Sequence, residues 1–194
     1  MVGAGLGAFS VLADGIIGGR LFGILGNIGS PWGLAAFFVG RLTRSPKRGA
    51  LAGALTLLVG VAVYYAVGAA RGYVVGEVNL VWTAIALVAG PVMGWSGAAI
   101  SSEPERPPLL AVAAPSAMLV AEALFLAIDR KVWRYDLGAE TYRLIDLGVM
   151  LALLVGGLLL PWIFEKDRHR RRIVYLFVVL AGVGGRSRSS CCGS

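Results

Sequence analysis

Two acidic residues lie within, or just beyond, one long apolar stretch, residues 108–128. Glu122 falls near the middle of that stretch, and Asp129 follows seven positions later on the same helical face. A charge at the centre of a membrane helix costs about 2.5–3.5 kcal/mol, so such residues are candidates for function. Together the two carboxylates could line a path for a cation or a proton that leads inward from one membrane surface. The alternative is a protonated Glu122 that is hydrogen-bonded to a neighbouring helix.

A second candidate site is the glycine-rich segment near the N-terminus. Asp14 and Arg20 are separated by about 240° around a regular helix, so one helix cannot bring them face to face. Either the chain breaks between them, or each finds a partner elsewhere. Further helix breakers surround Asn27 and Ser30, and we expect Ser30 to cap a helix that starts at Pro31. Interrupted helices form binding sites in many transporters, and a helix N-terminus can hold an anionic group. The alternative is an ordinary loop between two short helices.

Signatures of soluble enzymes are absent from the sequence, which has no G-x-S-x-G, no H-E-x-x-H and no Walker lysine. The only histidine, His169, sits among arginines, and the only cysteines are the adjacent Cys191 and Cys192. These residues provide neither a metal-binding spacing nor a disulfide framework. We therefore expect no metal and no cofactor, and we favour a non-enzymatic role. A membrane enzyme that acts on lipid is a third alternative.

The elements that must position these residues are apolar segments of membrane-crossing length. The chain has 194 residues, of which 57% are hydrophobic and 15% charged, whereas soluble domains contain about 25% charged residues. Five stretches are long and apolar enough to cross a bilayer, and two shorter ones come close. The clearest are residues 49–70, 79–101, 108–128 and 144–164. We predict an all-α transmembrane bundle of six or seven helices, with one domain over residues 1–185 and a disordered polar tail at 186–194.

The basic residues predict the orientation of the bundle. One basic loop, residues 41–48, contains Arg41, Arg44, Lys47 and Arg48, and a second covers residues 166–172. Four predicted crossings separate these loops, so both should lie on the same side, which the positive-inside rule makes cytoplasmic. These loops account for much of the net charge of +7. We therefore expect the lipid bilayer, and no nucleic acid, as the partner.

Small residues recur on one face of two predicted helices. They are Gly49, Gly53, Thr56 and Gly60 in the first helix, and Gly90, Gly94, Gly97 and Ser101 in the second. Small side chains let helix backbones approach closely, so that dispersion contacts drive their association in lipid. We expect these two helices to pack tightly on each other, or each on another partner. The five tryptophans mostly fall near segment ends, as in an interfacial belt.

A resemblance to a known family rests on a few motifs. Residues 29–32 read Gly-Ser-Pro-Trp, residues 36–41 read Ala-Phe-Phe-Val-Gly-Arg, and Gly53, Tyr64 and Tyr65 follow. Over roughly residues 20–180 the chain resembles an uncharacterised family of small bacterial multi-pass membrane proteins, classed as a domain of unknown function. The resemblance implies a bacterial inner membrane and carries no known catalytic or binding residues.

Two functions follow from these observations. The first is a small transporter or a membrane-embedded substrate-binding subunit, with Glu122, Asp129 and the break around Asn27 lining the site. The second is a structural or assembly protein that binds another membrane protein, or a second copy of itself, through its glycine-rich faces. A transporter should contain a polar cavity that reaches Glu122, whereas an assembly protein should leave a glycine face open to lipid.

Overall fold

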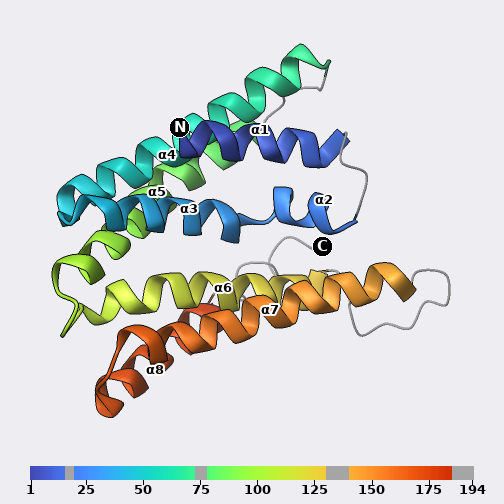
Figure 1. Ribbon diagram of the computed structural model, residues 1–194. Coiled ribbons are helices and arrows are strands. Elements are labelled where there is room, and N and C mark those ends of the chain that lie inside the picture. Colours follow the sequence, from blue (N-terminus) through green and yellow to red (C-terminus); the bar gives the residue numbers. More distant parts are fainter. Residues whose placement is uncertain (16–19, 73–77, 130–139, 185–194) are drawn as a thin grey trace, which may run out of the picture. The chain divides into compact units, whose positions relative to one another are not determined.

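The chain folds into α-helices throughout the residues that the computed structural model describes, which are 1–15, 20–72, 78–129 and 140–184 (Figure 1). The predicted all-α class is confirmed, with eight helices in this part of the chain; that six or seven helices cross the membrane stays a prediction. They are α1 (Val2–Gly15), α2 (Arg20–Asn27), α3 (Gly29–Thr43), α4 (Pro46–Ala70), α5 (Val78–Ser102), α6 (Leu109–Asp129), α7 (Glu140–Phe164) and α8 (Arg168–Gly184).

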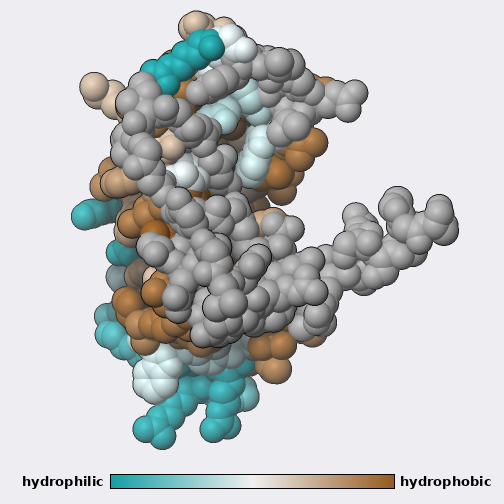
Figure 2. Space-filling model, turned by 90° about the vertical axis from the view of Figure 1, so that its right-hand side faces the viewer, coloured by the Kyte–Doolittle hydropathy of each residue, from teal (hydrophilic) through white to brown (hydrophobic). Residues whose placement is uncertain are grey.

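Among the helices of the described residues, four are long and apolar enough to cross a membrane. Their candidate spans are Pro46–Ala70, Leu80–Ser102, Leu109–Ile128 and Leu144–Phe164, close to the four clearest predicted stretches. Many of their large apolar side chains are exposed, and hydrophobic residues form much of the coloured surface in Figure 2. Such a surface is stable in lipid rather than in water. The chain is a multi-pass membrane protein.

The expectation of five long stretches is corrected in the described residues, where four are found and the N-terminal segment from Val2 is a shorter apolar helix. The described residues among the first 43 otherwise lack a helix of spanning length. They form three helices, and α1 has only 14 residues. Each glycine inside a helix costs about 1 kcal/mol relative to alanine, which disfavours one long helix in this glycine-rich part. In Figure 1, α2 and α3 follow one another along nearly the same line and run back beside α1. The return is interrupted at a single residue, Ile28.

The chain forms two compact units, Met1–Pro107 and Pro108–Ser194. The first contains α1 to α5, and the second contains α6 to α8. That residues 1–185 form one domain stays a prediction, and the predicted disordered tail lies outside the described residues.

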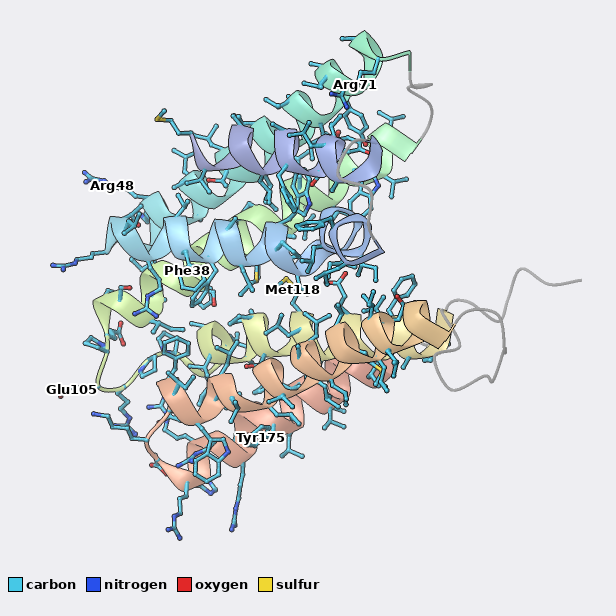
Figure 3. All side chains as sticks on the ribbon, turned by 45° about the vertical axis from the view of Figure 1, so that its right-hand side comes forward. Phe38, Arg48, Arg71, Glu105, Met118 and Tyr175 are labelled. Atoms are coloured by element: carbon cyan, nitrogen blue, oxygen red, sulfur yellow. The ribbon has the colours of Figure 1, made fainter. Side chains whose placement is uncertain are left out.

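Glycine allows the most extensive helix contact in the first unit, between α4 and α5. A Cβ atom built on Gly53 would collide with the carbonyl oxygen of Gly90, and one built on Gly94 with that of Gly49. Dispersion contacts between backbones at this distance hold helices together in lipid. Arg48 and Arg71 lie at opposite ends of α4 (Figure 3), so the charges bracket the apolar span.

The helix α1 packs along α4 through further small residues. A Cβ built on Gly3 would collide with the carbonyl oxygen of Thr56, and one built on Gly7 with that of Gly60. Because both contacts advance by four residues, α1 and α4 run in the same direction. Gly97 of α5 approaches the backbone of Phe37 in α3 in a similar way.

In the second unit, α6 packs against both α7 and α8. The helix α8 buries Val174 and Val178, which lie one turn apart on one face. The hydroxyl of Tyr175 donates a hydrogen bond of 2.7 Å to the carbonyl oxygen of Leu158, which ties α8 to α7.

Most of the basic segment 166–172, which was predicted as a loop, is helical and forms the start of α8. The helix begins at Arg168, five residues before Ile173, where the last apolar segment was expected to start. A carboxylate oxygen of Asp167 accepts the backbone N–H of His169 at 2.7 Å. Aspartate in this position satisfies a helix's first N–H groups and so favours an early start.

Candidate functional site

The interruption between α2 and α3 is a candidate site. Ile28 has extended backbone angles, φ −93° and ψ 151°, and its N–H donates to the carbonyl oxygen of Ile24 at 3.0 Å. The helix α3 starts at Gly29, so Ser30 and Pro31 are its second and third residues. The prediction that Ser30 caps the helix is therefore wrong. Proline is tolerated anywhere in a first turn, because no N–H there has a partner within the helix.

Trp32 bridges the interruption. Its indole Nε1 donates to the carbonyl oxygen of Gly26 at 3.4 Å, in the last turn of α2. A Cβ atom built on Gly60 of α4 would lie 2.7 Å from Cζ3 of the indole, so only glycine leaves room for this ring. Trp32 is half-buried and packs against α2 and α4, while its place in an interfacial belt stays a prediction.

Ser10 of α1 supplies a buried hydroxyl to the same region. A Cβ atom built on Gly26 of α2 would lie 3.3 Å from the Cα of Ser10. Its side chain is 0% exposed, and Oγ has no hydrogen-bond partner within the described part of the chain. By contrast, Thr56, Ser101 and Ser116 each donate to the carbonyl four residues earlier, at 2.8, 3.1 and 3.1 Å. Ser10 is the exception among these hydroxyls, and a buried polar group of this kind calls for a partner.

The interruption lies level with the middle of a candidate span. Gly60, which receives Trp32 and Gly7, stands near the centre of α4. Ser10 is three residues beyond Gly7 on α1. At this depth irregular backbone is tolerated only where it is buried in protein or lines a cavity.

The residues predicted from the sequence are divided between the two units. Ser30 is 1% exposed in α3, and Glu122 is partly exposed in α6. The backbones of Asp14, Arg20, Asn27 and Asp129 are helical, but their side chains lie outside the described residues. The acidic stripe and the separation of Asp14 from Arg20 therefore stay predictions.

The predicted small-residue faces are used within the first unit. Gly49, Gly53, Gly90 and Gly94 approach one another across α4 and α5. Thr56 and Gly60 contact α1, and Gly97 contacts α3. Within the described residues, no three His, Cys, Asp or Glu side chains group as a metal site.

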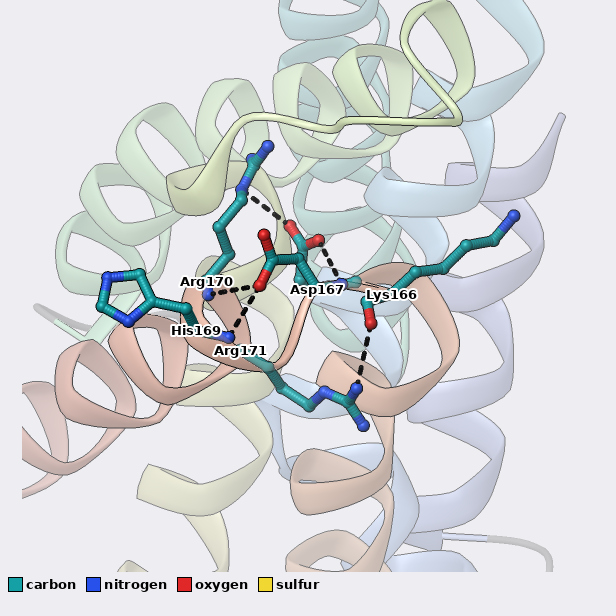
Figure 4. Close-up of polar contacts among 6 residues, drawn as sticks. Lys166, Asp167, His169, Arg170 and Arg171 are labelled. Atoms are coloured by element: carbon teal, nitrogen blue, oxygen red, sulfur yellow. Dashed lines mark hydrogen bonds and ion pairs between the residues drawn. The ribbon is translucent and has the colours of Figure 1, made fainter.

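A second polar cluster lies where α7 ends and α8 begins, in residues 165–172, which we call the elbow. Glu165 is 2% exposed; its Oε2 lies 3.1 Å from Nε of Arg170, and its Oε1 accepts the N–H of Asp167 at 3.1 Å (Figure 4). The pKa of Asp167 is held below its ordinary value, first because its carboxylate accepts the N–H of His169, and also because of nearby positive charge.

Neither Ser10 nor Glu165 was predicted as a functional residue, and Trp32 was predicted only as part of an interfacial belt and of the family motif. Ser10 carried a weak signal, as the one hydroxyl in the apolar run from Val2 to Ala13. Glu165 carried a signal too, because it directly follows the apolar stretch of α7.

Comparisons with known proteins give the family. No curated protein and no solved structure matches the chain. A family of unknown function, DUF6518, matches residues 1–187, which extends the expected resemblance over nearly the whole chain. The chain therefore belongs to the DUF6518 family of unknown function.

Proposed function

We propose that this protein is a membrane-embedded binding subunit or small transporter, whose ligand site is the interruption between α2 and α3. The observation that carries the proposal is the buried Ser10 hydroxyl without a partner, beside the last turn of α2. Leaving such a group unsatisfied costs about 1–3 kcal/mol. A water molecule or a small polar ligand would satisfy it, and both need a polar site at this depth.

Two further features fit a binding role. The interrupted crossing resembles the discontinuous helices of transporters, whose backbone groups at the break hold ligands or ions. Glu122 lies within a candidate span of α6 and is a candidate for ion coupling. The matching family has no assigned function, so the match neither supports nor opposes a binding role.

A thermal-shift screen in detergent tests the proposal with a panel of amino acids, small sugars and monovalent salts. We expect some compound to raise the melting temperature of the wild type and to lose that effect in Ser10→Ala. Ser116→Ala is the matched control, because that buried hydroxyl donates within its own helix. Equal responses of the three proteins to every compound would contradict a site at Ser10.

Ion coupling is tested separately in proteoliposomes to which the compound that the screen identifies is added from outside. Under the transport proposal, Glu122→Gln abolishes uptake driven by an ion gradient and leaves the thermal shift intact. Loss of the thermal shift as well would place Glu122 in ligand binding instead.

The second candidate function is assembly with another membrane protein. The glycine faces of α4 and α5 are occupied within the first unit, but α7 carries Gly148, Ala152 and Gly156 one turn apart. A Cβ on Gly148 would meet nothing within 4 Å, and Ala152 is exposed. Replacing Gly148 and Ala152 by leucine should then abolish cross-linking to the partner and leave the thermal shift unchanged.

A further inference from the structure

The elbow buries one acidic side chain, Glu165, and leaves most of its basic side chains exposed. Residues 165–172 contain five basic and two acidic residues. Glu165 is buried against Arg170, and Asp167 accepts backbone N–H groups at the start of α8. Lys166, Arg168 and Arg172 are exposed, and the described part of the chain offers none of them an ion pair.

One cation of the elbow is held in a fixed position. The guanidinium carbon of Arg171 lies 3.9 Å from the centroid of the Trp162 ring, and its Nη2 donates to the carbonyl oxygen of Lys166 at 3.2 Å. A guanidinium has five N–H donors in a planar fork that fits phosphate oxygens, and only this one bond is formed by its terminal nitrogens in the described residues. Because stacking and the hydrogen bond to the carbonyl already hold the Arg171 side chain, it loses less conformational entropy when it binds a phosphate.

The level of the elbow matches that of lipid headgroups. Trp162 is 65% exposed in the last turn of α7, at the end of a candidate span, where tryptophan marks the membrane interface. Its stacked Arg171 and the exposed Lys166 and Arg168 follow directly after that span. Basic residues next to a transmembrane helix attract anionic lipids.

We infer that the elbow binds the phosphate-bearing headgroup of an anionic phospholipid, with Arg171 held on Trp162 as its anchor and Lys166, Arg168 and Arg172 around it.

Native mass spectrometry of the full chain in a zwitterionic detergent tests this inference. The measurement is the affinity for the first bound phosphatidylglycerol, with phosphatidylcholine as the neutral lipid. Each cation near an anionic headgroup contributes about fivefold in affinity, so Arg168→Gln with Arg172→Gln should weaken binding about 25-fold. Both side chains are exposed, so the fold should survive.

The matched control removes the same charge elsewhere, where α3 ends and α4 begins, with Arg44→Gln and Lys47→Gln. In this control we expect the affinity for the first bound lipid to fall less than about threefold, because the first lipid is expected at the elbow, where the headgroup contacts are strongest. Equal losses from the two double variants would show general charge attraction and overturn the inference. Equal affinity for phosphatidylcholine would overturn it as well.

Trp162→Ala removes the ring that holds Arg171 in position and leaves the net charge unchanged, so it tests the position of the cation apart from its charge. We expect a loss of about fivefold in affinity, the contribution of one cation. Unchanged binding would overturn the anchoring role and with it the inference. Displacement of the lipid by excess inorganic phosphate, at matched ionic strength, would indicate a site for free phosphate and also overturn it; unchanged lipid binding supports a headgroup site.

Discussion

Nε of Arg170 lies 3.1 Å from Oε2 of Glu165, a carboxylate that is 2% exposed at the end of α7. Arg170 belongs to the first turn of α8 and is 15% exposed. The pair therefore joins two helices across the elbow, and it sets the direction in which the chain leaves α7. Its burial makes each partner depend on the other, because a buried charge without its counter-ion is unfavourable.

Removing one partner of this pair should destabilise the second unit. We expect Glu165→Ala to lower the free energy of unfolding by about 3 kcal/mol, because it leaves the largely buried Arg170 without its counter-ion. Unfolding in a titration with dodecyl sulfate, followed by tryptophan fluorescence, measures the loss. Glu165→Leu combined with Arg170→Leu should recover most of it, since apolar residues replace the pair. A double variant no more stable than Glu165→Ala would contradict this account.

The cap of α8 should depend on pH. The pKa of Asp167 is lowered in the folded protein from 3.8, mainly by the N–H of His169. The stabilisation is therefore fully present above 3.8 and is lost as the pH falls through the lower folded pKa. Asp167→Asn keeps a capping oxygen and does not titrate. The melting temperature of the wild type relative to Asp167→Asn should fall on acidification below pH 3.8. A constant difference would show that the charge plays no part.

A single methyl group should disrupt the contact between α4 and α5. In Gly53→Ala the new Cβ would collide with the carbonyl oxygen of Gly90, so we expect a loss of about 1–3 kcal/mol in stability. Gly148→Ala in α7 is the control, since its Cβ would meet nothing within 4 Å. Alanine is the better helix former by about 1 kcal/mol, so the control should be neutral or stabilising. The same unfolding titration compares them, and equal effects would refute close packing at Gly53.

The two basic segments should face the same side of the membrane. Cys191 and Cys192 are first replaced by serine, and single cysteines are then placed at Ser45, at His169 and at Arg71. An impermeant thiol reagent should label Ser45→Cys and His169→Cys only from the cytoplasmic side, and Arg71→Cys only from outside, because one span separates Ser45 from Arg71 and four separate it from His169. Labelling of the first two from opposite sides would refute the orientation.

Local composition was enough to predict the helical class, the membrane location and the four candidate spans within a few residues. It was also enough to predict a break between Gly26 and Pro31, which falls at Ile28. These properties depend on contiguous residues, because transfer of a segment into lipid and glycine's effect on a helix are local free energies. The start of α8 was misplaced because the arginines were assigned to a loop and the capping by Asp167 was not considered.

Contacts between distant segments could not be read from the chain in this way. Small-residue spacing identified the faces of Gly53 and Gly94, but it left open whether these faces meet each other or another partner. Composition likewise could not show that Ser10 is buried without a partner, or that Trp32 enters the space beside Gly60. These features arise where helices cross, and the crossing is decided by which backbones can approach most closely, a property of the assembled helices and not of any one of them.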